Sequence, residues 1–450
     1  MTKMKAPRLS TTHIIMLSFL AAILVGSFLL ALPVSSADGK GVPYIDALFT
    51  ATTATCVTGL VTVTTASAWS VFGQVVILLL IQIGGLGIIT VMSGLMILIN
   101  HRMGIGDRLL IQDAFNLNTM SGLGEFIKKV LLGTLIIEGA GALLYMPVFV
   151  SDFGVRGIWI SVFNSVSAFC NAGMDIIGEN SLYDYATNPL VNLTTSALII
   201  LGGIGYIVWW DVIRVFGTEG KHRLRRLTLH SKIALSVSLL LVLVGGVCIF
   251  AFEYNNPATI GSLSLFDKIQ VSLFQSVTTR TAGFASIPQQ DLTDPSAIFS
   301  ILLMFIGGSP VGTAGGIKTV TLAVLIASAM ASVTGKNDVT LFNRTVSKQA
   351  VSKASAVCTT SFAILFISTL LLAAVTDAPF MDVLYETASA TATVGLTRGI
   401  TPTLSVIGKT IIIINMYLGR VGPISLALAL NGNKKTTNAV KNPTEDISVG

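Results

Sequence analysis

Long apolar stretches and short half-polar stretches alternate along the chain, and the same alternation occurs four times. The first apolar runs lie at residues 13–34, 125–150, 230–252 and 354–375, the short segments at 43–58, 158–172, 265–282 and 379–394, and the second apolar runs at 70–99, 190–216, 296–333 and 403–429. A helix that crosses a bilayer needs about 20 apolar residues, so the long runs are predicted to be membrane helices. The short segments contain too many Ser, Thr, Asn and Gln residues to cross lipid, and they are typical of re-entrant segments enclosed by protein or water.

The pattern predicts an all-α polytopic membrane protein with four helix–loop–helix repeats. We place the repeats at residues 1–100, 101–217, 218–335 and 336–430, followed by a polar cytoplasmic tail at 431–450. Composition agrees, because 52% of the 450 residues are hydrophobic and only 11% are charged, whereas soluble domains carry about a quarter charged residues. The expected surroundings are a lipid bilayer. In a membrane protein, a formal charge of +6 is an indication of which loops face the cytoplasm. No nucleic-acid partner is expected.

The N-terminus resembles a secretory signal peptide, since Lys3, Lys5 and Arg8 precede an apolar run. That run continues to Pro33, which is longer than the usual apolar region of about 7–15 residues in such a peptide. We therefore expect it to stay in the protein as the first helix.

Basic residues predict the orientation. Of the 28 Lys and Arg residues, 20 fall in the links near 100–129, 214–232 and 334–353 and in the two tails, and 6 fall on the opposite side. Cytoplasmic loops carry the excess of Lys and Arg. Both termini are therefore expected in the cytoplasm, and the short segments are expected to open to the outside.

A glycine closes each short segment. These glycines are spaced 114, 110 and 112 residues apart in the strings TCVTGL, FCNAGM, TRTAGF and TATVGL, and they are Gly59, Gly173, Gly283 and Gly395. Glycine adopts positive φ without steric cost, and rings of backbone carbonyls can replace the water shell of a cation. Four such strings at near-equal spacing predict loops that converge on a pseudo-fourfold axis and line one ion pore. The alternative is that the glycines only allow close packing in a helical bundle built from repeats.

A second glycine cluster lies in each second apolar run: IGGLG (83–87), LGGIG (201–205), IGGSP (306–310) and LGRVG (418–422). The third run, 296–333, would form a helix of about 57 Å at about 1.5 Å per residue, against a bilayer core of roughly 30 Å. Its middle reads GGSPVGTAGG, and each interior glycine costs about 1 kcal/mol and the proline about 3 kcal/mol of helix stability. We expect a break at 307–316. A flexible loop there suits a gate, and a simple kink is the alternative.

Charged residues inside the predicted membrane region need partners. Lys318 follows the expected break directly, where it either reaches the cytoplasmic interface or holds the loop. Arg420 is expected to face the pore or a partner, and Glu138 is expected to be a partner for polar groups between helices rather than an ion site. Arg280 lies within a glycine string. Its side chain is expected to point away from the ion path, because a positive charge there would repel a permeating cation.

Other classes of function find little support. The sequence has no H-E-x-x-H or G-x-S-x-G motif, and its four histidines lie at helix ends or in links: His13, His101, His222 and His230. A membrane-embedded enzyme is therefore the weaker alternative, and neither a covalently bound cofactor nor a nucleotide site is expected. A voltage sensor would need a ladder of arginines in one helix, and RLRR (223–226) is only a short cluster. The four cysteines have no CxxC spacing, which argues against a zinc site.

The four glycine strings, the helix pairs around them and the GGSPVGTAGG segment make the chain resemble the membrane subunit of the Ktr/Trk/HKT superfamily of potassium transporters, and most of all its bacterial Ktr branch. The resemblance covers residues from about 13 to about 428. It implies a potassium filter formed by four strands: Cys56, Val57, Thr58 and Gly59; Cys170, Asn171, Ala172 and Gly173; Arg280, Thr281, Ala282 and Gly283; Ala392, Thr393, Val394 and Gly395. A serine in place of the first glycine accompanies sodium preference in the family, so glycine at all four positions implies potassium.

The resemblance also implies a gate. Its residues would be those of the glycine-rich break and two basic residues near it: Gly307, Gly308, Ser309, Pro310, Gly312, Thr313, Gly315, Gly316, Lys318 and Arg420. It further implies a homodimer in a bacterial plasma membrane, with a cytosolic ring of nucleotide-binding regulatory subunits. Potassium is the implied substrate, bound at the filter carbonyls, with uptake either driven by its own gradient or dependent on sodium. A sodium-selective transporter of the same superfamily remains the alternative.

Overall fold

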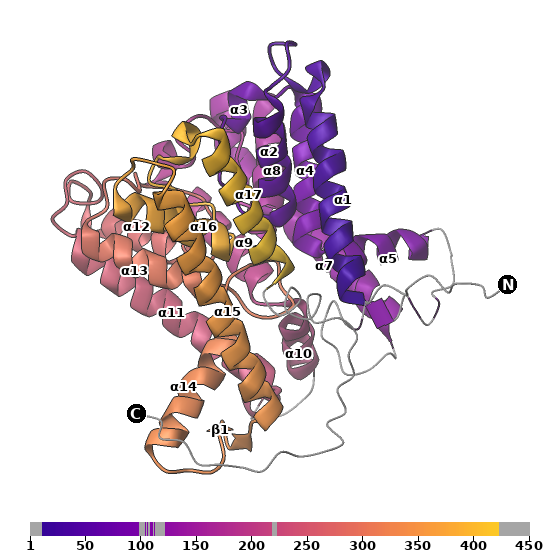
Figure 1. Cartoon of the computed structure of the whole chain (residues 1–450), viewed down its shortest axis with the longest axis vertical. Helices are drawn as coiled ribbons and strands as arrows, with labels where there is room; N and C mark the ends of the chain where they lie inside the picture. Colours follow the sequence, from indigo (N-terminus) through magenta and orange to yellow (C-terminus); the bar gives the residue numbers. More distant parts are fainter. Residues whose placement is uncertain are drawn as a thin grey trace.

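A computed structural model of the chain describes residues 11–98, 122–217 and 223–422, together with positions 104, 106, 109, 110 and 112. The described part is almost entirely helical (Figure 1). The tail at 431–450, His101, His222 and the three basic residues before the first helix lie outside the described residues.

Four long apolar helices begin the four repeats: α1 (Thr11–Ala31), α7 (Leu123–Phe153), α11 (Leu229–Glu253) and α15 (Lys348–Ala373). Within the described ranges, these four are individually long and apolar enough to cross a membrane. Their outer faces expose large apolar side chains, for example Leu135 on α7, Leu240 on α11 and Phe366 on α15. Such faces suit contact with lipid.

Four short helices follow: α2 (Tyr44–Cys56), α8 (Arg156–Phe169), α12 (Leu265–Thr278) and α16 (Phe380–Ala392). They are half-polar but buried at their C-terminal ends. Several hydroxyl groups donate back to the carbonyl four residues earlier, as Thr52 does to Leu48 at 2.7 Å and Thr387 to Val383 at 2.9 Å. This internal bonding lets polar residues lie inside a protein core at little cost.

The second helices differ from the prediction in two repeats. The expected single helices at 70–99 and 190–216 are each broken into two parts that meet at 96°: α4 (Val71–Leu86) with α5 (Ile88–Leu98), and α9 (Pro189–Gly203) with α10 (Tyr206–Phe216). The prediction of continuous helices was wrong because Gly87 and Gly205 adopt φ of 85° and 94°, which ends a right-handed helix. The sequence signal for each bend is the third glycine of the second glycine cluster: Gly87 in IGGLG and Gly205 in LGGIG.

The remaining second helices are also short. In the third repeat α13 (Asp294–Phe305) and α14 (Thr319–Val333) are separated by a non-helical segment, which we call the 306–318 loop. In the fourth repeat α17 (Val406–Val421) ends before Gly422, whose φ of 89° matches that of Gly87 and Gly205.

The smaller elements lie in the connections. They are α3 (Thr65–Ala68), the 3-10 turns η1 (Pro33–Ser35), η2 (Tyr183–Tyr185), η3 (Arg223–Arg226) and η4 (Thr401–Thr403), and an antiparallel hairpin of β1 (Thr340–Leu341) and β2 (Arg344–Thr345). The hairpin, α14 and α10 lie at the lower end of the view in Figure 1.

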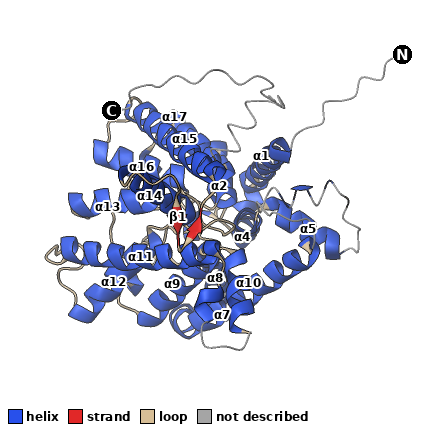
Figure 2. Ribbon diagram, turned by 90° about the horizontal axis from the view of Figure 1, so that it is seen from below, coloured by secondary structure: helices blue, strands red, loops and turns tan. Residues whose placement is uncertain are grey.

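The four repeats close into a ring, which Figure 2 shows as four groups of helices around a common centre. Each second helix packs against the short helix of the next repeat: α4 against α8, α9 against α12, α13 against α16, and α17 back against α2. The last contact joins the fourth repeat to the first. The predicted fold class, four helix–pore-loop–helix repeats in a membrane protein, is confirmed.

Candidate functional site: a ring of glycine strands above an intramembrane loop

Each short helix leads into a short segment that ends in a predicted glycine, and in the first and fourth repeats this segment begins with the last helical residue, Cys56 or Ala392. We call the segments 56–59, 170–173, 280–283 and 392–395 the glycine strands. Their glycines all have positive φ, as expected. So do the residues two positions earlier, which are not glycines: Val57 (55°), Asn171 (58°), Thr281 (64°) and Thr393 (51°). The same unusual backbone therefore occurs at four equivalent places. Sequence reasoning missed the second set because three of its four members are β-branched, and such residues rarely adopt this conformation.

The four glycines meet one another in cyclic order. A Cβ built on Gly59 would lie 2.6 Å from Ala172 O, and one on Gly173 would lie 2.5 Å from Ala282 O. Corresponding clashes occur between Gly283 and Val394 O and between Gly395 and Thr58 O. Each glycine therefore lies against the carbonyl that precedes the next glycine, and these contacts run through all four repeats in a closed cycle. No side chain other than hydrogen fits at these positions without displacing the ring.

Hydroxyl groups fix three of the strands. The residue six positions before the glycine accepts a hydrogen bond from the amide of the glycine or of the residue after it: Gly59 N to Thr53 Oγ1 (2.9 Å), Met174 N to Ser167 Oγ (3.1 Å) and Gly395 N to Ser389 Oγ (3.0 Å). The third repeat has Val277 at this position. There Thr278 Oγ1 donates to Phe284 O at 2.6 Å instead.

One side of the ring opens into a cavity of about 160 Å³. All four glycines line it, together with the loop after the second glycine strand, which contributes Asp175 and Glu179. Asp175 Oδ1 accepts a hydrogen bond from Ile177 N at 3.2 Å. Burial raises the pKa of the Asp175 carboxyl above its ordinary value, although hydrogen bonds from Ser181 and from backbone amides oppose the rise.

The 306–318 loop lies against three of the strands. Gly315 N donates to Thr281 Oγ1 at 3.1 Å, and Thr313 Oγ1 donates to Asn171 Oδ1 at 2.9 Å and to Phe169 O at 3.0 Å. A Cβ on Gly315 would collide with the side chain of Thr393. These contacts place the loop directly next to the second, third and fourth strands.

The same loop is bonded to the bend of the second repeat. Ser309 N donates to Gly203 O (2.8 Å), Thr313 N donates to Gly202 O (3.1 Å), and Tyr206 N donates to Val311 O (2.9 Å). Side chains would disturb this contact, because Cβ atoms built on Gly308 and Gly312 would crowd Gly203 O and Gly202 O, and one on Gly205 would clash with Pro310 O. The loop thus closes against a helix break that also depends on glycine.

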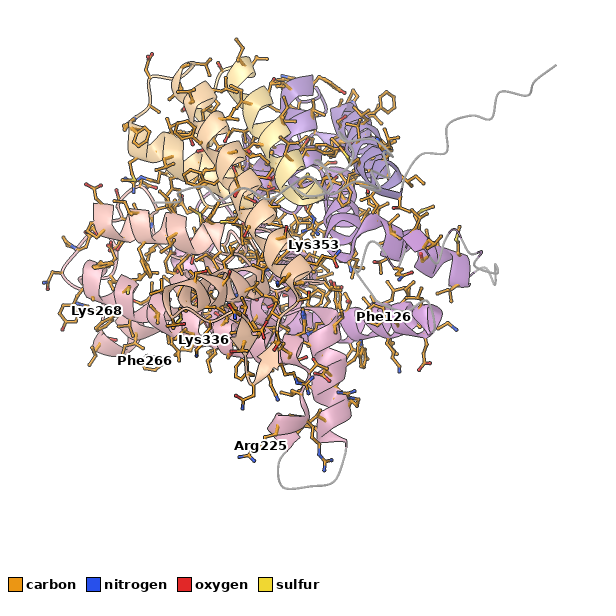
Figure 3. All side chains as sticks on the ribbon, turned by 60° about the horizontal axis from the view of Figure 1, so that its bottom comes forward. Phe126, Arg225, Phe266, Lys268, Lys336 and Lys353 are labelled. Atoms are coloured by element: carbon orange, nitrogen blue, oxygen red, sulfur yellow. The ribbon has the colours of Figure 1, made fainter. Side chains whose placement is uncertain are left out.

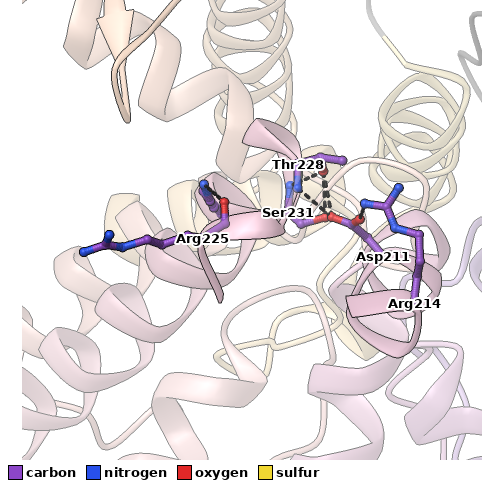
Figure 4. A network of polar contacts seen from close by, with 6 residues as sticks. Asp211, Arg214, Arg225, Thr228 and Ser231 are labelled. Carbon is purple, nitrogen blue, oxygen red and sulfur yellow. Dashed lines mark hydrogen bonds and ion pairs between the residues drawn. The ribbon is translucent and has the colours of Figure 1, made fainter. Parts of the chain in front are cut away.

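Beyond this bend, α10 is attached to the start of α11 (Figure 4). Asp211 accepts hydrogen bonds from the Thr228 amide and hydroxyl, both at 2.8 Å, and pairs with Arg214 at 2.5 Å. Thr228 in turn caps α11 by accepting from Ser231 N at 3.3 Å. The arrangement holds α10 in its bent position next to the loop.

Basic side chains bind the loop carbonyls. Arg420 donates to Thr313 O at 2.6 Å and to Gly84 O at 2.5 Å, and Lys318 Nζ donates to Ala314 O at 2.6 Å. The geometry therefore favours the second expectation for Lys318, that it holds the loop. Arg280 points away from the ring, as expected, because its guanidinium donates to Ser238 and to Gly307 O. Gly316, with φ of 65°, turns the chain between these contacts and α14.

Other predicted residues lie behind the ring. Cys56, Cys170 and Ala392 begin their strands and are fully buried. Glu138 lies in α7, accepts a hydrogen bond from Gln82 Nε2 at 3.2 Å, and has Cys170 Sγ 3.9 Å from Oε1. Its partners lie between helices, in keeping with the expectation that it pairs with polar groups there.

This geometry agrees with a comparison to known families. A family model described as TrkH, cation transport protein, matches residues 5–435. The chain belongs to the TrkH family of cation transport proteins. The resemblance stated from the sequence is thereby confirmed, and so is the assignment to membrane proteins.

Relatives of this TrkH-family chain match it over nearly its whole length. The Ktr system potassium uptake protein B of Bacillus subtilis is 37% identical over 444 residues, which cover 98% of this chain and 97% of that protein. The potassium/sodium uptake protein NtpJ of Enterococcus hirae is 38% identical, with 100% and 99% covered. The crystal structure of the potassium transporter TrkH from Vibrio parahaemolyticus matches with a TM-score of 0.75 at 17% identity, over 94% of this chain and 85% of that one. At that identity the last match supports the fold alone.

Proposed function

We propose that this protein carries potassium into the cell through a selectivity filter formed by the four glycine strands. The observation that carries the proposal is the cyclic contact between each glycine and the carbonyl before the next glycine. In this proposal the four carbonyl oxygens replace the hydration shell of a monovalent cation. The printed names of two relatives, with potassium uptake in one and potassium/sodium uptake in the other, support the choice of ion.

The 306–318 loop acts as the gate. It lies next to three strands and closes the path on the side away from the acidic cavity. Arg420 and Lys318 stabilise this closed position through hydrogen bonds to Thr313 O and Ala314 O. Opening requires the loop to leave these donors and the bend at Gly205.

The cavity that contains Asp175 and Glu179 is the outer entrance, and both termini are cytoplasmic in the plasma membrane of a bacterium. Acidic groups at the mouth of a pore raise the local concentration of cations.

On this orientation the basic links lie inside, and Figure 3 labels three of their residues, Arg225, Lys336 and Lys353. We assign to this surface the docking of a cytosolic nucleotide-binding ring, on a homodimer of the membrane subunit. The basis is the resemblance to the Ktr branch described from the sequence, together with the word system in the name of the relative, Ktr system potassium uptake protein B.

Growth of bacteria that lack their own potassium uptake tests the proposal. Expression of this chain, alone and with a regulatory subunit of a Ktr system, should restore growth in low-potassium medium and produce rubidium uptake that potassium inhibits. Repeating the uptake with and without external sodium decides between simple and sodium-dependent transport. Sodium uptake that potassium does not inhibit would favour the alternative, a sodium-selective transporter. Absence of any cation uptake at normal membrane abundance, with the partner present, would contradict the proposal.

A further inference from the structure

Two arginines break the fourfold pattern of the sequence. The first is Arg280. When the four glycine strands are aligned, it occupies the position at which the other repeats have a small residue: Cys56, Cys170 and Ala392. In the alignment of the second glycine clusters, Arg420 stands where the other repeats have Gly85, Gly203 and Gly308. Both arginines donate to carbonyl oxygens of the 306–318 loop. Both departures from the fourfold pattern therefore involve the same segment, the 306–318 loop.

The third strand also lacks the anchor found in the other three. Val277 has no hydroxyl at the position where Thr53, Ser167 and Ser389 accept a hydrogen bond from the amide of the glycine or of the residue after it. Between this position and its glycine, the third strand instead has Arg280. The guanidinium reaches outward from the strand, so it can attach the strand to neighbouring elements.

The surroundings of Arg280 define what it can attach. Its side chain lies in the core, and the residue is only 8% exposed. It donates to Ser238 O and Ser238 Oγ on α11, both at 3.2 Å, and to Gly307 O at 3.3 Å. All three acceptors are uncharged oxygens. A buried charge depends on each such bond, because an unpaired one is costly in a low-dielectric interior.

A small cavity lies beside this arginine. It has a volume of about 20 Å³ and is lined by Arg280, Asn171, Ser238, Gly203 and Gly308, among others. That volume holds about one water molecule. Arg280 Nε and Asn171 Nδ2 are buried donors without a protein acceptor.

We propose that Arg280 is a positioning residue that couples the 306–318 loop to the third glycine strand, so that movement of the loop alters the filter. This inference rests on the proposed function, with the strands as filter and the loop as gate. Arg280 holds the start of the loop at Gly307, whereas Arg420 holds its middle at Thr313 from the fourth repeat. In the third strand, position 277 holds no amide and Thr278 Oγ1 bonds Phe284 O instead, so the bond from Arg280 to Gly307 O passes movement of the loop to the start of this strand.

Two readouts test this coupling in the full-length protein. The first is the rate at which an impermeant thiol reagent, added from the cytoplasmic side, labels Ser309→Cys in a background with Cys248→Ala and Cys358→Ala. Ser309 is fully buried in the closed loop, so labelling reports opening. The second is the ratio of rubidium to sodium uptake. Both are measured for Arg280→Met, for Arg280→Lys and for the control Ser238→Ala, which leaves the bond to Gly307 in place.

Loss of a hydrogen bond from a charged donor should speed labelling of the Met variant about tenfold, equivalent to about 1.4 kcal/mol. The uptake ratio should fall in the same variant. The Lys variant should show a smaller change of both, and so should Ser238→Ala, which removes one acceptor and keeps the bond to Gly307 O. When the 306–318 loop is shortened, Arg280→Met should no longer change the uptake ratio, because the strand has then already lost its attachment.

Parental labelling and a parental uptake ratio in a well-expressed Met variant would overturn the inference. An equal fall in the ratio with the loop shortened would also overturn it, since Arg280 would then act on the strand alone. If the Met variant does not reach the membrane, the Lys variant decides by the same two criteria. Failure of potassium uptake in the parent would contradict the proposed function. The labelling rate does not depend on which ion is carried, so it would still test whether Arg280 holds the loop.

Discussion

The glycine ring and the 306–318 loop differ in symmetry. Every repeat contributes the same backbone to the ring, with positive φ at the glycine and two residues before it. The loop occurs in one repeat, and its partners come from the other three as well: Gly203 from the second, Arg420 from the fourth and, through Arg420, Gly84 from the first. A cation on an axis needs equal ligands on all sides, whereas a gate needs only one element that moves. Under the proposed function, ion selection therefore belongs to the symmetric ring and gating to the asymmetric loop.

The largest effect is expected from a substitution within the glycine ring. Gly395→Ala should reduce rubidium uptake at least about tenfold, because its Cβ would collide with Thr58 O at a position with φ of 101°. Gly399→Ala is a matched control, since Gly399 has φ of 97° and no atom near a built Cβ. Both variants carry the backbone penalty of roughly 1–2 kcal/mol for a left-handed residue. Uptake reduced equally in both variants would show that backbone strain, and not the ring contact, is responsible.

The second-largest effect is expected from a change to the asymmetric part of the molecule, the 306–318 loop. Shortening the loop between residues 308 and 316 should raise basal rubidium flux about tenfold, because donors such as Arg420 and Lys318 lose acceptors worth about 1.4 kcal/mol or more in the closed state. Flux is measured in vesicles without a regulatory subunit, and Gly59→Ser serves as a comparison. That variant should lower the preference for rubidium over sodium without raising basal flux. Unchanged or lower flux in a folded, shortened protein would argue against a gate.

How far the sequence alone predicts this molecule depends on the range of the interactions. The four repeats and the ring glycines follow from local composition and spacing, and the structure has them. The bends at Gly87 and Gly205 were missed, because long apolar runs favour a continuous helix, and at Gly205 the closure involves bonds to a loop about 100 residues away in sequence. The left-handed Val57 and Thr393 were missed for a related reason. Local preference opposes that conformation, so only the surrounding structure can impose it.

The contacts of the basic residues could not be read from the sequence either. Arg280 and Arg420 stand out as charges in apolar surroundings, which predicts partners. The partners themselves, Gly307 O and Thr313 O, are backbone atoms with no sequence signature. The repeat alignment gives the better clue, because each arginine replaces a residue that is small in the other three repeats.

The smallest effect concerns a second asymmetry, the acidic side of the cavity that we propose as the outer entrance. Asp175→Asn should weaken the apparent affinity for potassium about twofold at neutral pH, through loss of one charge near the entrance. The raised pKa of Asp175 means that it takes up a proton above the ordinary aspartate range near 4. Affinity of the parent should therefore decline as pH falls toward that range, and the variant should decline less. Asp184→Asn, outside the cavity lining, is the control, and an identical pH profile in parent and Asp175→Asn would exclude this role.

The ring is tested most directly by locating the ion. Crystals of the protein grown with thallium or rubidium in place of potassium give an anomalous signal at the cation. The account predicts a peak on the axis between the carbonyl oxygens of Thr58, Ala172, Ala282 and Val394, and its loss when Gly395→Ala displaces the ring. Occupied ion sites elsewhere in the membrane region, with none at these four oxygens, would contradict it.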